Sequence, residues 1–189
     1  DILFQNFNDI GTPTLDEPIF ISDAQGYQFA PNAISNGSNG VYGIFADQGS
    51  GSIDLRVQFL DGVAPSLEDG GKLALKGMDG DVRYNHAFRS DDRQLLLMWE
   101  DNRSTKKIYG NWLVDDVLGH ANGVQVSFSD NSSAETDLSQ PRMVNTGSGI
   151  YLATFDATGS PKKIRINRLD NDLVNLWDSA GVAISPEFD

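Results

Sequence analysis

The sequence contains no cysteine and only two histidines among its 189 residues. The lack of cysteine excludes a disulfide framework, a thiolate metal site and a cysteine nucleophile. Basic residues are also scarce, because 14 Lys and Arg stand against 27 Asp and Glu and leave a formal net charge of −13. Nucleic acids and anionic membrane surfaces both need a basic face, so this charge argues against either one as the main partner.

Long apolar runs are missing as well. No stretch approaches the roughly 18 apolar residues that a membrane-spanning helix needs, so we expect no membrane insertion. The chain opens at Asp1, without a methionine or a charged and then apolar leader, and we expect a mature product or a segment of a longer protein. Its hydrophobic fraction of 39% is that of a globular chain, which argues against disorder over most of its length.

One strand-like segment recurs four times along the chain. Its copies begin at Ile2, Leu55, Ile108 and Ile164, so that consecutive copies start 53, 53 and 56 residues apart. A second segment, with the alternating apolar residues of a half-buried strand, follows each copy at residues 19–22, 73–76, 124–127 and 182–185. Glycine precedes three of these second segments, at Gly71, Gly123 and Gly181, as is typical of a turn before a strand.

Two further strand-like segments belong to each unit. A largely apolar segment closes on an aromatic residue, at Phe45, Trp99 and Phe155, and this spacing predicts that the three aromatics are equivalent. Continuous apolar character is typical of a strand buried on both faces, so we expect Trp99 in the core. A weaker segment precedes it, around residues 28–34, 83–88 and 140–144. No helical periodicity interrupts this pattern.

The repeat unit is therefore four short strands in roughly 55 residues, which fits an antiparallel β-propeller blade. Four copies in register favour the propeller over a β-sandwich, which stays the alternative. The chain is then one all-β domain or segment, with a half repeat at 1–22 and whole repeats at 28–76, 83–127 and 140–185. An open arc of about three and a half blades leaves apolar faces in water, so we expect a larger propeller chain or a protein partner to close it.

One unit resembles the repeat of large bacterial secreted and cell-surface propeller proteins. It contains Trp99-Glu100-Asp101-Asn102-Arg103, then Ile108-Tyr109, then Leu113 with Asp115, and finally the Asn-Gly-Val-Gln-Val-Ser segment at residues 122–127. The other units keep only parts of this pattern, and the matching residues are structural rather than catalytic. The resemblance implies an extracellular or bacterial cell-surface location and an adhesive or scaffold role.

Motifs for catalysis are absent. The histidines, His86 and His120, lie in non-equivalent parts of different repeats, with neither a G-x-S-x-G elbow nor an HExxH spacing. Carboxylates are abundant enough for a glycosidase acid and nucleophile pair, although the Asp-box turns of propeller sialidases do not occur. We therefore expect a non-enzymatic scaffold or adhesive binding module without catalytic residues, and the alternative is a portion of an extracellular glycan-acting hydrolase.

The candidate binding residues are Trp112, Arg83, Arg89 and Arg93. Trp112 departs from the repeat, whose other copies have Asn6, Phe59 and Arg168 at this position. The three arginines gather in one unit of an otherwise acidic chain, where they could engage an acidic partner or form surface salt bridges. Carbohydrate is a further possible ligand, because an exposed tryptophan can stack on a sugar ring.

Three acidic turns could bind calcium, which takes six to eight oxygen ligands. They are residues 79–81, the pair Asp115-Asp116, and residues 170–172. None completes an EF-hand pattern, and Asp, Asn and Gly are favoured in turns without any metal. We therefore predict no metal site and no cofactor, with calcium as the alternative.

Overall fold

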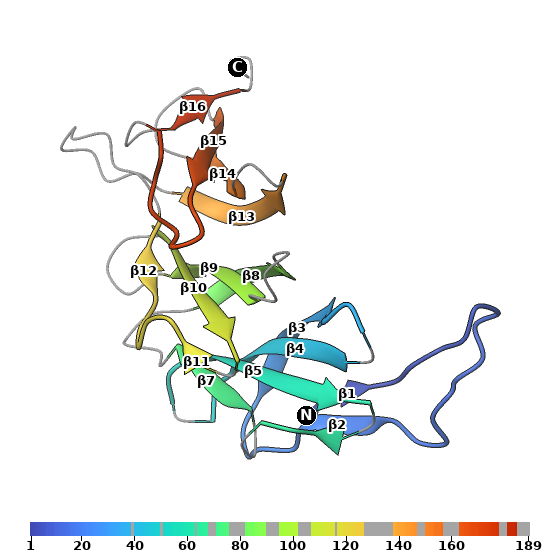
Figure 1. Ribbon diagram of the computed structural model, residues 1–189. Coiled ribbons are helices and arrows are strands. Elements are labelled where there is room, and N and C mark those ends of the chain that lie inside the picture. Colours follow the sequence, from blue (N-terminus) through green and yellow to red (C-terminus); the bar gives the residue numbers. More distant parts are fainter. Residues whose placement is uncertain are drawn as a thin grey trace.

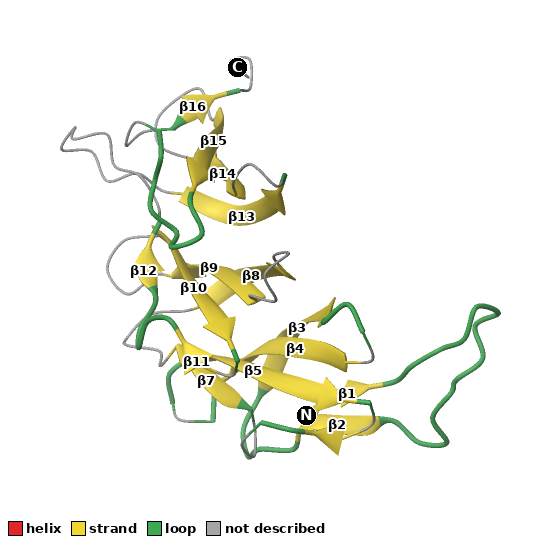
Figure 2. Ribbon diagram, viewed as in Figure 1, coloured by secondary structure: helices red, strands yellow, loops and turns green. Residues whose placement is uncertain are grey.

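The computed structural model describes residues 1–38, 40–49, 51–62, 64–67, 71–75, 82–89, 95–101, 107–115, 117–126, 138–146, 150–156, 163–177 and 181–184. Every regular element within these residues is a β-strand, as expected for an all-β chain (Figure 2). The same residues include no helix with the length and apolarity required to cross a membrane.

The strands form antiparallel sheets that follow one another along the chain (Figure 1). A two-stranded sheet, here called the half blade, pairs β1 (Ile2–Phe4) with β2 (Ile19–Ser22). The first blade contains β3 (Gln28–Ser35), β4 (Gly40–Asp47), β5 (Asp54–Asp61), β6 (Ala64–Pro65) and β7 (Lys72–Leu75). The second blade contains β8 (Val82–Arg89), β9 (Leu95–Asp101), β10 (Lys107–Val114), β11 (Val117–Leu118) and β12 (Val124–Gln125). The third blade contains β13 (Leu138–Asn145), β14 (Ile150–Asp156), β15 (Lys163–Leu169) and β16 (Val182–Ala183).

The apolar core lies between successive sheets. Ile2 of the half blade packs with Phe45 of the first blade, and Leu55 of the first blade packs with Trp99 of the second, which is fully buried as expected. Met98 of the second blade shares a third cluster with residues of the third blade. The inner strands β3, β8 and β13 are neighbours across these boundaries. Antiparallel sheets packed face to face around neighbouring inner strands form a β-propeller, so the expected fold class is confirmed.

The register of the strands corrects one predicted equivalence. In the second strand of each blade, Ile44, Met98 and Ala153 pair with Asn32, His86 and Arg142 of the inner strands. The next position therefore holds Phe45, Trp99 and Thr154, so the predicted equivalence of Phe155 with Trp99 is wrong by one residue. Spacing between aromatic residues does not fix a register, because a strand can move its aromatic by one position. Thr154, which is 3% exposed, occupies the buried place instead.

A side-chain amide recurs at one position of the third strand of each blade, and directly after β1 in the half blade. The four residues are Gln5, Gln58, Asn111 and Asn167, and the amide oxygen of each accepts the N–H of the following residue at 2.7 to 2.9 Å. Asn111 also binds both backbone groups of His120, and Gln58 accepts the N–H of Leu67. These amides attach a strand to the loop that follows it. We did not single out these amides from the sequence, although they recur 53, 53 and 56 residues apart, like the strand that carries them.

Candidate functional site

Each inner strand is interrupted by a β-bulge at the same place. The register shifts between Phe29 and Asn32 in β3, between Arg83 and His86 in β8, and between Ser139 and Arg142 in β13. Inside two of these bulges, Ala30 and Gln140 have φ angles of 51° and 52°, a left-handed conformation that non-glycine residues rarely adopt. Bulges and strained backbone gather at functional sites, so we take these inner-strand bulges as the candidate site.

A carboxylate from the second blade contacts the bulge of the third. Glu100, on β9, is 3% exposed, and its Oε2 accepts the N–H of Gln140 at 3.3 Å. Gln140 itself is exposed at the surface. The bulge of β13 is thereby held against the neighbouring blade with its amide side chain in reach of a ligand.

His86 makes a second polar contact between the same two blades. Its Nδ1 accepts the N–H of Met143 on β13 at 2.9 Å. Burial lowers the pKa of His86 below its ordinary value, and the positive charge of Arg142 lowers this pKa further. The lowered pKa favours the neutral imidazole. Because Nδ1 accepts this hydrogen bond, the neutral ring carries its proton on Nε2, which can donate a hydrogen bond.

We expect the free energy of unfolding to fall as the pH drops from about 7.5 to about 5.5. The folded state lowers the pKa of His86 below 6.5, so in this window the unfolded chain binds more protons and acid favours unfolding. Denaturant titrations at several pH values measure the effect. His86→Asn places the residue found at the equivalent position of the first blade and should flatten the pH dependence, whereas His120→Gln should retain it. Equal pH slopes for wild type and His86→Asn would contradict the assignment.

The predicted binding residues that the structure describes all lie in the second blade, Trp112 on β10 and Arg83 and Arg89 on β8. The ring of Trp112 meets His120 edge-on, with centroids 4.5 Å apart, and lies over Gly119 and against the core between the second and third blades. This places Trp112 beside the loop that carries Gly119 and His120, on the side of the second blade that faces the third. Arg83 and Arg89 stand at the two ends of β8, where their backbones pair with Glu100 and Leu95. Arg93 lies outside the described residues.

The acidic turns proposed for calcium have backbone partners where they are described. Asp170 Oδ1 accepts the N–H groups of Asp172 and Val174 at 3.0 and 2.8 Å. Asn8 makes the same pair of contacts in the half blade, so a neutral side chain serves this turn equally well. Asp115 adopts a left-handed φ of 46°, while Asp116 and residues 79–81 lie outside the described part. Within that part, no three His, Asp or Glu side chains gather as metal ligands.

Asp47 closes the second strand of the first blade and is held by several partners. Its oxygens accept hydrogen bonds from Gln28, from the N–H of Gly49 and from Arg56, whose Nε lies 2.7 Å away. Burial alone would raise the pKa of Asp47, but these hydrogen bonds and the charge of Arg56 lower it below the ordinary value. Asp47 therefore forms a structural ion pair with Arg56 at the end of the strand.

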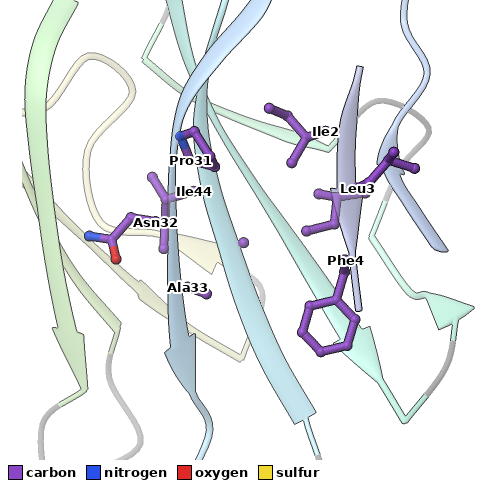
Figure 3. Close-up of a pocket in the computed structure, with 9 residues that line it drawn as sticks. Ile2, Leu3, Phe4, Pro31, Asn32, Ala33 and Ile44 are labelled. Atoms are coloured by element: carbon purple, nitrogen blue, oxygen red, sulfur yellow. The ribbon is translucent and has the colours of Figure 1, made fainter. Parts of the chain in front are cut away.

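An apolar pocket of about 200 Å³ lies between the half blade and the first bulge. Figure 3 shows Ile2 and Phe4 of β1 on one side of it, and Pro31, Asn32 and Ala33 of β3 on the other. Because these β3 residues follow Ala30, the pocket opens beside the bulge. The site thus combines strained backbone, amide side chains and an apolar wall.

Three solved structures with a similar fold are those of a xylanase and two arabinanases. The chain is similar to an endo-1,4-β-xylanase from Bacteroides thetaiotaomicron, with 12% identity and a TM-score of 0.51 over 88% of this chain and 56% of that one. It is similar to an exo-1,5-α-L-arabinanase from a bovine ruminal metagenomic library, with 12% identity and a TM-score of 0.55 over 96% of this chain and 70% of that one. An endo-arabinase from Bacteroides thetaiotaomicron has 11% identity and a TM-score of 0.51, over 86% and 63% of the two chains. No protein-family model and no curated protein sequence matches.

The comparison corrects the expected function. Xylanase and arabinanases are β-propeller glycoside hydrolases, and this contradicts the expectation of a non-enzymatic scaffold or adhesive module. The propeller-like fold implied by the resemblance to bacterial surface propellers is confirmed, whereas the specific repeat motif stays a prediction. The error has a physical reason: the motif residues build strands and turns, whereas function depends on the groups of a site and not on the fold that carries them. At 11 to 12% identity the likeness itself extends to the fold alone.

Proposed function

We propose that this chain is part of an extracellular bacterial glycoside hydrolase that acts on a polysaccharide. The observation that carries the proposal is the similarity to three polysaccharide-degrading enzymes over 86 to 96% of the chain. The inner-strand bulges agree with it, because they concentrate strained backbone and polar groups at one place. The chain spans 56% to 70% of the length of these enzymes, so the proposal concerns a part of the catalytic unit.

The inner strands are suited to hold a sugar rather than to cleave it alone. Glycoside hydrolysis needs two carboxyl groups, about 5 to 9.5 Å apart. No Asp or Glu occurs in β3, β8 or β13, and Glu100 is the carboxylate brought to the third bulge. In the proposed enzyme, Asn32, Gln140 and the Nε2 proton of His86 bind and orient sugar hydroxyl groups. Loops or a further sheet then supply the remaining carboxylates.

Exposed apolar residues on the outer face of the third blade indicate that a further sheet packs there. Ile164 and Ile184 of this face are 39% and 52% exposed. Their equivalents in the second blade, Ile108 and Val126, form the same backbone hydrogen bond and are 0% and 3% exposed, because the third blade covers them. We therefore propose that another blade of a longer polypeptide, or of a partner protein, covers the third one.

The proposal predicts that the protein isolated from its source releases reducing ends from at least one plant polysaccharide. Linear arabinan and xylan are the first substrates, and the denatured mass of the isolated polypeptide establishes the length of the tested enzyme. Gln140→Ala should raise KM about tenfold through one lost sugar contact. Ala30 shows that alanine adopts this backbone conformation. Gln125→Ala, on the outer strand β12, is the matched control and should leave KM unchanged.

Turnover of no glycan by the folded, full-length protein would contradict the proposal. Equal effects of Gln140→Ala and Gln125→Ala would place the sugar site elsewhere on the protein.

A further inference from the structure

We infer that the inner-strand site selects an anionic glycan, whose carboxylate or sulfate group binds the guanidinium of Arg142. The inference rests on the proposed function and names the substrate class of the same site.

The first argument is the charge of the inner strands. β3, β8 and β13 have eight residues each and contain none of the chain's 27 acidic residues. They contain Arg83, Arg89 and Arg142 among the chain's 14 basic residues. The rest of the chain is strongly acidic, so the net charge of these three strands has the opposite sign. A basic group on such a strand favours an anionic ligand at that place over a general attraction for polyanions.

The second argument is the position of Arg142. The residue follows the bulge of β13, two positions after Gln140, and its side chain is exposed. Its Nη1 donates to the carbonyl of Pro141 at 2.8 Å, which fixes the orientation of the guanidinium. A guanidinium has five N–H donors in a planar fork, so others are available for a carboxylate or sulfate.

The third argument is the set of neutral groups around this charge. His86 accepts the N–H of Met143, the residue after Arg142, and the positive charge of Arg142 lowers the pKa of His86. The neutral imidazole carries its proton on Nε2. Gln140, two residues before Arg142 on the same strand, is also exposed. The nearest described carboxylate, Glu100, is buried and accepts the N–H of Gln140. The exposed groups of the site are therefore one cation and neutral hydrogen-bonding side chains, which match an acidic sugar with one anionic group among several hydroxyls.

Two matched pairs of probes test the inference on the full-length protein. Polygalacturonate and its methyl ester differ in the carboxylate, whereas dextran sulfate and dextran differ in the sulfate. Isothermal titration calorimetry should give an affinity at least tenfold higher for the charged member of one pair. The pair that responds identifies the anionic group. Linear arabinan serves as an additional neutral probe.

Variants assign the preference to Arg142. Arg142→Gln should lower the affinity for the charged probe about tenfold to a hundredfold and leave the affinity for its neutral counterpart unchanged. Arg142→Lys retains the charge and should recover part of the loss. Lys72→Gln, on β7 of the first blade, removes the same charge elsewhere and should change neither affinity. The Tm of all variants is measured in parallel.

Equal binding of charged and neutral probes overturns the inference and leaves the proposed function intact. A loss of affinity for both members of a pair, together with a lower Tm for Arg142→Gln, also overturns it, because Arg142 would then be structural. Binding and turnover of no glycan overturn both proposals.

Discussion

Asn111→Ala is expected to lower the free energy of unfolding by about 3 to 5 kcal/mol, measured by denaturant titration. Asn111 is 0% exposed. Its Oδ1 accepts the N–H groups of Trp112 and His120 at 2.9 and 3.0 Å, and its Nδ2 donates to the carbonyl of His120 at 2.7 Å. Alanine removes the buried side chain and leaves these partly buried backbone groups without their hydrogen-bond partner. The loop that carries His120 against Trp112 would also lose its attachment.

Asn36→Ala is the control for this prediction. The oxygen of Asn36 also accepts three hydrogen bonds, from the N–H and hydroxyl groups of Ser38 and the N–H of Gly40, but two of them are exposed. Water can replace exposed partners, so we expect a loss of no more than about 1 kcal/mol. Similar losses for the two variants would show that burial does not decide the role of the amide.

Gly123→Ala should destabilise the protein by about 2 to 4 kcal/mol, from left-handed strain and a steric clash together. Gly123 has a φ of +70°, and an added Cβ would lie 2.5 Å from the ring of Trp99 and 2.9 Å from the carbonyl of Gly110. Trp99 is 0% exposed and packs between the first and second blades, so its ring has no space to move into. Thermal and denaturant unfolding of the variant measure the change.

Gly51→Ala separates the two contributions. Gly51 also has a positive φ, +90°, but an added Cβ would meet no atom within 4 Å. Only the backbone strain remains, so the expected loss is about 1 kcal/mol. If Gly123→Ala were no more destabilising than Gly51→Ala, the close contact with Trp99 would contribute nothing to the loss of stability.

The glycines before the outer strands show which features of the fold can be predicted from the sequence. Gly71, Gly123 and Gly181 were found by their place before a strand, where a turn was expected. In the structure, each has a positive φ, and its Cβ would lie 2.8 to 3.0 Å from the carbonyl of an equivalent third-strand residue. The sequence therefore predicts where glycine is needed. The close approach of another backbone, which makes it necessary, depends on the pairing of strands.

The candidate site was less accessible to prediction. Arg83 and His86 were visible as charged or titratable residues, but Gln140 and Glu100 lie 40 positions apart and His86 and Met143 lie 57 apart. Their contacts exist because β8 and β9 belong to one blade and β13 to its neighbour. The bulges, which move each inner strand by one residue, have no sequence pattern that we recognised. A site formed by strands that are distant in the sequence is therefore recognised only in the folded structure.

The sequence by itself determined the strands, the repeat of about 55 residues and the propeller class. Alternating apolar residues and turn glycines act within a few neighbouring positions, so they are legible along the chain. The tertiary structure alone decided that Thr154 and not Phe155 matches Trp99, that Trp112 lies beside the loop that carries His120, and that Arg142 lies beside His86. These facts depend on register and on packing between blades, because moving a strand by one residue changes every partner it meets.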